Sequence, residues 1–352
     1  MRIIQRYITS SMIWSTLLAL FVLISLFSFF TLIDQLGDTG RGKYGVLQAI
    51  TYVLLTVPKL AYELFPIAAV IGSMTVLGIL AQNSELDVIR TSGVSKFRLT
   101  LILLRSAVGL VVLAVIIGEV FAPISEEKAQ NLRSMALTEQ IAMKTKNGFW
   151  IRDGNSFINI RKPLPDNRIE QIYLYEFDDD DVLRSSLYAE SAVYSNGQWL
   201  MEDVEESMIS DDKIEKRVLK HAAWESLINP EMINIVTVKP QYLTLVGLAR
   251  YINFLKGNSQ STLLYEQALW KKLITPFTIF AMIVLAVPMV RGHSRFTTIG
   301  HRVFLGALAG VIFHLCNQVS GNLGVVYGIN PALSVTLPTI LLIVLICYLV
   351  RD

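Results

Sequence analysis

Apolar residues gather in long runs that divide the chain into two hydrophobic blocks. A membrane-spanning helix needs about 20 predominantly apolar residues, and runs near that length cover residues 9–33, 64–81, 99–123, 273–290, 303–319 and 332–350. They predict about six transmembrane helices, three on either side of a polar stretch of about 140 residues. A shorter apolar run at 45–57 either extends the second helix or lies in the membrane interface.

The polar stretch has the alternation of β-strands. Two short strands flank Asp153-Gly154, Asn196-Gly197 is a second turn signal, and alternation continues through residues 171–177, 185–194 and 199–209. Several short strands in series predict a sandwich or a jelly-roll-like sheet. The fold class is therefore an α-helical integral membrane protein with an inserted all-β, jelly-roll-like domain. We divide it into residues 1–124, 125–260 and 261–352, with a helix expected at 243–255 before the second block.

Composition agrees with a membrane protein. Charged residues make up 17% of the chain, against about 25% in an ordinary soluble domain. The net charge of +2 gives no reason to expect a nucleic-acid partner. Cys316 and Cys347 both lie in apolar runs without disulfide or metal-ligand spacing, so they are expected to face lipid or the helix core.

Basic residues of the short loops predict the orientation. The positive-inside rule places Lys- and Arg-rich loops in the cytoplasm, and one set of loops holds most of these residues: Arg2, Arg6, Arg90, Lys96, Arg98, Arg291, Arg295, Arg302 and Arg351. We therefore expect both termini in the cytoplasm and the β domain in the periplasm. The first apolar run exceeds the length of a signal-peptide core, so we expect a retained helix.

The sequence has no recognisable catalytic motif, so we do not expect an enzyme. Residues 37–44 have the glycine and lysine spacing of a phosphate-binding loop, but Tyr44 replaces the magnesium-binding Ser or Thr, and a flexible loop is expected there. The histidines lack zinc spacing, and Asp178–Asp181 lacks the glycine and alternation of a calcium loop, so it is expected to be a solvated hairpin tip. The chain is expected to bind no cofactor, and energy for any active transport must come from elsewhere.

A short helix is predicted at about 84–93, between the second and third spans. Ser84 can cap it, Glu85 and Asp87 suit the positive end of the helix dipole, and Gly93 can end it. Leu86, Ile89 and Arg90 recur at helical spacing. The helix is either a connector on the lipid headgroups or a docking helix for a cytoplasmic partner, and its acidic first turn favours docking.

Two charged residues interrupt the third apolar run. Arg105 lies near its cytoplasmic end and can snorkel to the interface. Glu119 is 14 residues further on, too far to pair with Arg105. Near the outer rim, Glu119 could orient a basic residue or a polar helix end, and a structural role is expected for both residues.

The order of several short motifs resembles the LptF/LptG (YjgP/YjgQ) family of lipopolysaccharide export permeases. The resemblance covers nearly the whole chain and rests on residues 32–36, 80–86 with Ser92-Gly93, 118–119, 122–123, 148–154, 251–255, Tyr265 and 270–272. It implies one permease of an ABC exporter that extracts lipopolysaccharide from the bacterial inner membrane. It further implies an LptF-like permease partner, two LptB-like ATPase subunits that bind ATP and magnesium, an LptC-like bitopic protein and a periplasmic bridge.

The same resemblance implies roles for particular residues. The short cytoplasmic helix would be the coupling helix seated on the ATPase, with Glu85 on the family's coupling glutamate and Leu86, Asp87 and Arg90 beside it. Phosphates of lipopolysaccharide call for cations at the outer rim, and the candidates are Arg41, Lys43, Lys128 and Arg133, of which Arg133 matches a basic family position.

Two differences from the family pattern weaken the residue roles that the resemblance implies along the first helix. Thr31 stands where the family has a lysine, and Gly37-Asp38 replaces a basic pair, so Arg41 and Lys43 either compensate or are ordinary loop charges. Two other functions stay open: a permease of another ABC exporter, for lipoproteins or peptides, and a membrane sensor with a periplasmic ligand domain. The sensor reading is disfavoured because the longest predicted cytoplasmic segment is under about 20 residues.

Overall fold

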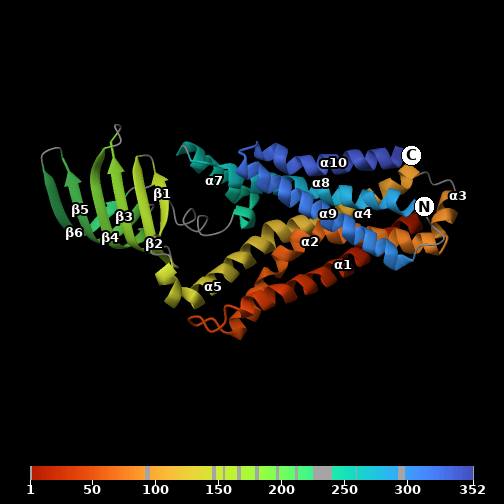
Figure 1. Cartoon of the computed structure of the whole chain (residues 1–352), viewed down its shortest axis with the longest axis horizontal. Helices are drawn as coiled ribbons and strands as arrows, with labels where there is room; N and C mark the ends of the chain where they lie inside the picture. The colour runs from red at the N-terminus through yellow and green to blue at the C-terminus, as the bar shows by residue number, and fades with distance from the viewer. Residues whose placement is uncertain are drawn as a thin grey trace.

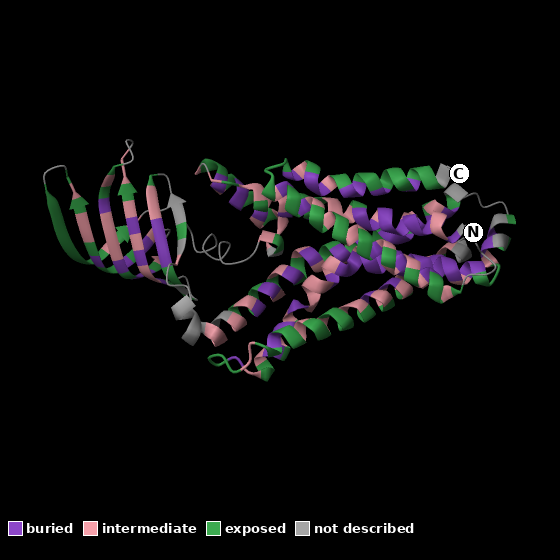
Figure 2. Cartoon of the chain, viewed as in Figure 1, coloured by how far each residue is buried: buried purple, intermediate pink, exposed green. Residues whose placement is uncertain are grey.

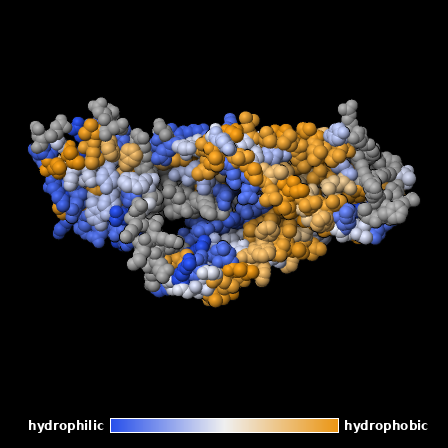
Figure 3. Space-filling view, viewed as in Figure 1, coloured by the Kyte–Doolittle hydropathy of each residue, from blue (hydrophilic) through white to orange (hydrophobic). Residues whose placement is uncertain are grey.

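The computed structural model describes residues 2–91, 96–144, 148–153, 155–164, 168–178, 182–195, 198–210, 213–224, 240–258, 260–291 and 298–351. A bundle of long helices forms one end of the molecule and a β-sheet forms the other (Figure 1). An apolar band covers the bundle, and hydrophilic surface gathers beyond it on both sides (Figure 3). This distribution is that of a protein with a membrane-embedded middle and polar ends.

Six helices in the described part of the chain are long and apolar enough to cross a membrane, as predicted. The long helical elements of the bundle are α1 (Arg2–Leu36), α2 (Val46–Gln82), α4 (Lys96–Ile116), α5 (Ala122–Lys144), α8 (Leu263–Arg291), α9 (Ile299–Val326) and α10 (Pro331–Arg351). The helices α4 and α5 form one span because the π-helical turn η1 (Ile117–Phe121) joins them. The apolar run at 45–57 is part of α2, which settles the two alternatives for it.

Helix α2 is the buried axis of the bundle. Its most apolar window is 83% buried, compared with 11% for α1 and 17% for α9. Figure 2 shows the same contrast between α2 and the exposed outer helices. Cys316 on α9 and Cys347 on α10 are both exposed, in agreement with the lipid-facing alternative. The outer faces of α1 and α9 therefore present apolar surface that lipid or a partner helix must cover.

Small residues bring α1 and α9 close to α2. A methyl group added at Gly72 of α2 would lie 2.6 Å from the Cα atom of Thr16 on α1. One added at Gly310 of α9 would lie 2.9 Å from a side-chain methyl of Ile67. Close backbone approach of this kind is a common basis of helix association in lipid, where no hydrophobic effect drives helices together.

The inserted domain is an antiparallel sheet in the described residues. Its strands are β1 (Phe149–Asp153), β2 (Ser156–Leu164), β3 (Arg168–Phe177), β4 (Leu183–Ser195), β5 (Gln198–Ile209) and β6 (Ile214–Trp224), and each pairs with the next along the chain. Alternate side chains form one apolar face around Trp199, Ile158, Ile172 and Val204, all fully buried. The predicted all-β domain is confirmed, whereas its closure into a jelly roll stays a prediction.

One strand was not predicted from the sequence. Strand β6 lies at the edge of the sheet, and its residues are exposed or half-buried, including Ile214 and Val218 at 70% and 73%. Its apolar residues do not alternate regularly with the charged ones, so the period-2 signal of a half-buried strand is missing. Charged side chains are typical of edge strands, where they discourage pairing with other chains.

The predicted boundary at residue 125 falls inside α5, which continues to Lys144 before β1 begins. The apolar run ends at Pro123, but the helix continues because the π-turn Ile117–Phe121 just before it widens the helix where a proline ring would otherwise clash. The helix expected at 243–255 is α7 (Leu245–Gly257), preceded by the 3₁₀ turn η2 (Pro240–Tyr242).

Glu119, on that π-turn, joins three segments of the chain. One carboxylate oxygen lies 2.6 Å from Lys272 Nζ of α8, and the other accepts a hydrogen bond of 2.8 Å from the Leu245 backbone N–H at the start of α7. Lys272 also donates to the Gly118 carbonyl oxygen at 3.3 Å, and its side chain is 6% exposed. Glu119 thus binds both a basic residue and a polar helix end, which confirms the two structural roles predicted for it.

Replacing Lys272 with Met should destabilise the bundle, because Glu119 would keep its charge without the opposite charge beside it. The expected loss is about 3 kcal/mol of unfolding free energy, measured as a lower melting temperature in detergent. The double variant Glu119→Gln, Lys272→Met removes both charges and should recover much of the loss. A single variant as stable as the wild type would contradict the role of the pair.

Gly72→Ala should lower the melting temperature because its new methyl group would overlap the α1 backbone, a form of overpacking that costs about 1–3 kcal/mol. Gly109→Ala is the matched control, since a methyl group at Gly109 of α4 meets nothing within 4 Å. Alanine favours a helix over glycine by about 1 kcal/mol, so the control should be neutral or stabilising. Equal melting temperatures for the two variants would show that α1 and α2 do not need this close approach.

Candidate functional site

Two regions of the bundle carry the residues singled out from the sequence, and they lie at its opposite ends. The first, which we call the rim cluster, is formed by Asp38, Arg41, Tyr44, Tyr52 and Arg133 where the α1–α2 loop meets α5. The second is the short helix α3 (Glu85–Thr91), at the end of the bundle away from the sheet (Figure 1).

Asp38 is the centre of the rim cluster. Its Oδ1 atom lies 2.7 Å from Arg41 Nη1, and its Oδ2 atom lies 2.7 Å from Arg133 Nη2. The residue therefore brings together two of the predicted headgroup cations that are 92 positions apart in the chain. The Asp38 carboxylate therefore organises two cations at the rim.

Arg133 contacts both Asp38 and an aromatic ring, and its side chain is partly exposed. Its guanidinium carbon lies 5.6 Å from the centroid of the Tyr52 ring, a cation–π contact that favours the charged side chain. Its Nε atom is buried, and it has no hydrogen-bond partner in the described structure. A buried donor without a partner is costly, so a rearrangement that brought an acceptor to this Nε atom would be favourable.

The loop that carries Arg41 and Lys43 is fixed to its neighbours. Tyr44 is 1% exposed and donates from its hydroxyl to Gln35 at 2.9 Å, while the Lys43 backbone N–H donates to the Ala136 carbonyl oxygen of α5 at 2.8 Å. Burial raises the pKa of the Tyr44 phenol, which keeps it a protonated donor. The phosphate-loop-like sequence is thus a packed turn and not the flexible loop we expected.

Gly42 explains part of that sequence pattern. Its φ is +58°, and a methyl group there would lie 2.7 Å from the Ala136 carbonyl oxygen. Only glycine fits a left-handed conformation in such close contact with another backbone. The glycine serves packing between the loop and α5, with no need for a phosphate.

A second group of polar residues next to the rim cluster was missed from the sequence. Glu126 of α5 is fully buried; it lies 3.9 Å from Lys59 Nζ of α2 and accepts a 2.7 Å hydrogen bond from Gln130. Gln130 also donates to the Tyr52 hydroxyl at 3.3 Å. Glu126 and Gln130 stand four residues apart, so recognising α5 as a helix would have placed them on one face.

Lys128 lies apart from this face. At about 100° per residue, it falls on the side of α5 opposite to Glu126, Gln130 and Arg133, and it is exposed. The structure therefore associates Arg41 and Arg133 in one cluster, places the backbone of Lys43 beside it, and directs Lys128 elsewhere.

The helix α3 covers most of the predicted range 84–93, although residues 92 and 93 lie outside the described part. Leu86 and Ile89 are 5% and 8% exposed within the core that α2 organises, whereas Glu85 is half-buried. Glu85 accepts a 3.2 Å hydrogen bond from the Asn83 side chain. Asp87 and Arg90 belong to the helix, and their side chains are not described.

The start of α3 differs in detail from the expected cap. Ser84 has a φ of +57°, an uncommon conformation for a serine, and its carbonyl oxygen accepts the first helical hydrogen bond from Val88. This turn reverses the chain between α2 and α3 within two residues. The apolar side of α3 is used to hold it on the bundle, so an incoming partner would meet its remaining surface.

Metal-binding groups of three or more His, Cys, Asp or Glu side chains are absent from the described residues. Asp178, the first residue of the acidic run, accepts from the Val182 backbone N–H and from Arg184 Nε at 2.9 and 2.7 Å. These bonds are local to one hairpin. Residues 179–181 lie outside the described part.

Comparison with known proteins places this architecture in a family. A family model described as "Lipopolysaccharide export system permease LptF/LptG" matches residues 6–352. The chain is 32% identical to the lipopolysaccharide export system permease protein LptG of Haemophilus influenzae, over 98% of this chain and 97% of the relative. It is 33% identical to the LptG protein of Escherichia coli K12, over 96% and 94%. The chain therefore belongs to the LptF/LptG family of lipopolysaccharide export system permeases.

Proposed function

We propose that this chain is one of two permease subunits of an ABC exporter, and that it moves lipopolysaccharide from the inner membrane toward a periplasmic bridge. Family membership, six membrane-spanning helices and the inserted sheet support this assignment. In this proposal an LptF-like permease completes the cavity, and an LptC-like bitopic protein joins the complex. The exposed apolar faces of α1 and α9 are where membrane partners would fit.

The observation that carries the proposal is α3 between two membrane-spanning helices. A short helix there, held by Leu86 and Ile89 and partly exposing Glu85, suits a subunit that receives mechanical work from a partner. In our proposal two LptB-like ATPase subunits dock at α3 and bind the ATP and magnesium, and this chain binds no cofactor and catalyses no reaction. Glu85, Leu86, Asp87 and Arg90 would form the coupling site.

The proposed orientation follows from the loop charges. The end with α3 and both termini would face the cytoplasm, and the sheet would lie in the periplasm. Six spans are consistent with both termini on the same side of the membrane. Arg302, one of the basic residues expected on the cytoplasmic side, donates to the Gly78 carbonyl oxygen at 2.9 Å, close to the α3 end of α2. The rim cluster would then lie at the periplasmic surface of the membrane.

The rim cluster is the proposed contact for headgroup phosphates. The partly exposed guanidinium of Arg133 and the exposed Arg41 would supply donors, and Lys43 would add charge beside them, whereas Lys128, on the opposite side of α5, would lie outside this contact. Guanidinium groups suit phosphate because their donors match its oxygens in pairs. Asp38 would release one or both arginines when the stronger anion arrives.

Glu85→Arg should reduce lipopolysaccharide export to near background, because it places a cation where we propose that a carboxylate contacts the ATPase. Measurements of complex assembly by co-purification, and of ATP hydrolysis and export in liposomes, separate lost docking from lost coupling. Thr91→Ala at the other end of α3 is a control that removes no charge and should export normally. Wild-type export by Glu85→Arg would rule out the coupling role of this glutamate.

Arg133→Gln should lower photocrosslinking of lipopolysaccharide near the rim about tenfold, since a charge-assisted hydrogen bond contributes about 1.5–3 kcal/mol. Asp38→Asn is the informative control. It removes the ion pair but leaves the guanidinium, so it should preserve or increase crosslinking. If Asp38→Asn lowered crosslinking as much as Arg133→Gln, Arg133 would be a structural ion-pair partner and not a headgroup ligand.

A further inference from the structure

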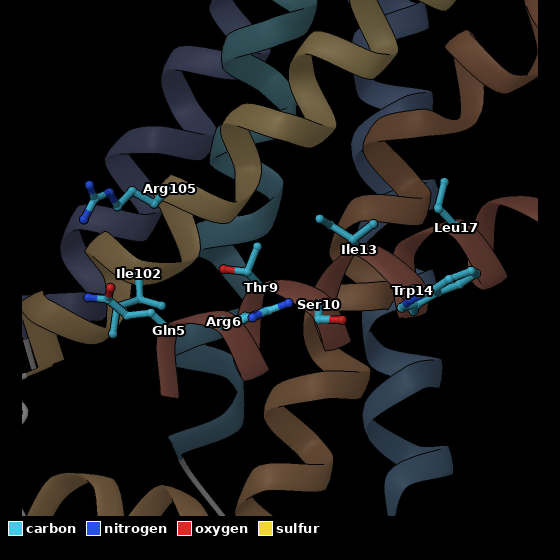
Figure 4. A pocket seen from close by; sticks show the side chains of 9 residues that line it. All are labelled: Gln5, Arg6, Thr9, Ser10, Ile13, Trp14, Leu17, Ile102 and Arg105. Carbon is cyan, nitrogen blue, oxygen red and sulfur yellow. The ribbon is translucent and has the colours of Figure 1, made fainter. Parts of the chain in front are cut away.

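A groove opens between α1 and α4, near the beginning of both helices (Figure 4). Its lining includes Arg6, Trp14 and Leu17 from α1 and Arg105 from α4. Its volume is about 820 Å³, within the range of sites that hold small molecules and lipids. The groove lies at the end of the bundle opposite to the rim cluster, so the headgroup site proposed above does not account for it.

The two arginines give the groove a positive charge. Both are exposed, and neither has a carboxylate within 4 Å in the part of the chain that the structure describes. Cations on membrane helices usually pair with an anion or reach the headgroup region. Figure 4 shows the two side chains on neighbouring helices, extended in different directions. Both line the same groove, so a headgroup bound in it would meet positive charge from both helices.

The groove changes from polar to apolar along its length. A 2.7 Å hydrogen bond between the Thr9 and Ser106 hydroxyls joins the two helices and sets Arg105 close to the level of Thr9, about one turn beyond Arg6. Further along α1, the lining becomes Ile13, Trp14 and Leu17. Residues 5 to 17 span about 18 Å of helix, close to the ~15 Å hydrocarbon depth of one leaflet.

We propose that this groove binds an anionic glycerophospholipid of the leaflet in which the chain begins. Arg6 and Arg105 would contact the phosphate, and one acyl chain would lie along Trp14 and Leu17. The side chain of Trp14 is 71% exposed and supplies a flat apolar surface for that chain. That this leaflet is the cytoplasmic one follows only from the orientation proposed above. The chemistry of the groove is independent of that orientation.

Native mass spectrometry of the purified permease complex would measure the binding of phosphatidylglycerol and of chain-matched phosphatidylcholine. Each basic residue at a membrane surface contributes about 1 kcal/mol to anionic-lipid binding, or about fivefold. Arg6→Gln and Arg105→Gln should each weaken phosphatidylglycerol binding about fivefold, and the double variant should weaken it about 25-fold. Arg6→Lys, Arg105→Lys should retain most of the binding because both charges remain.

Arg98→Gln is the matched control, since Arg98 lies on the first turns of α4 but does not line the groove. It should bind phosphatidylglycerol like the wild type. If the double variant fails to assemble, the binding measured for the two single variants tests the proposal. Equal binding of phosphatidylglycerol by the wild type and the Gln variants, or equal binding of the two lipids by the wild type, would overturn the proposal.

A photocrosslinker at Trp14 distinguishes a lipid from a protein occupant. Transfer of the label to phospholipid supports the proposal, and transfer to another subunit of the complex overturns it. These measurements use no lipopolysaccharide. A failure of the lipid site would therefore leave the export assignment untouched, and a failure of export would leave the lipid site testable.

Discussion

The two carboxylate oxygens of Glu119 fix how the halves of this protein meet. Through them the π-turn between α4 and α5 is bound to α8 by Lys272 and to α7 by its first backbone N–H. A partly buried charge is stable only with its partners in place, and here it holds the start of α7, which the Tyr251–Tyr265 ring contact and the Lys256–Glu266 ion pair also tie to α8. Glu119 therefore links the span before the inserted domain to the helices that follow it.

Much of the fold follows from the sequence because the bilayer imposes length and polarity on every span. Six apolar runs predicted six spans, and alternation predicted most of the strands. The predicted boundary at residue 125 falls inside a helix, because the apolar run ends at Pro123 and the π-turn that lets the helix continue leaves no signal in a hydropathy pattern. Strand β6 was not predicted for a related reason, since apolar and polar residues need not alternate regularly in an exposed edge strand.

The candidate sites were less predictable, because they depend on contacts between distant residues. Arg133 was named for its charge, but its partner Asp38 is 95 positions away and replaces an expected cation. Lys128 was named for the same reason and lies on the other side of α5. Glu126 and Gln130 went unnoticed because hydropathy alone ends the span at residue 123, although residues 124–144 are rich in helix formers and hold neither glycine nor proline. For Glu85, the local pattern of cap, dipole and spacing predicted only the short helix, which the structure confirms as α3; the coupling role of this glutamate was implied by the family resemblance and stays a prediction.

The continuity of α2 has a mechanical consequence. Its 37 residues make a rod about 55 Å long, with α3 at one end and Tyr52 of the rim cluster near the other. Because most of this helix is buried, one packed element joins the two proposed sites. In the proposed function, a movement of α2 at its α3 end would be transmitted to Tyr52, whose ring lies against the Arg133 guanidinium. Pro58 and Pro66, both inside α2, are the positions where a bend in that helix is expected.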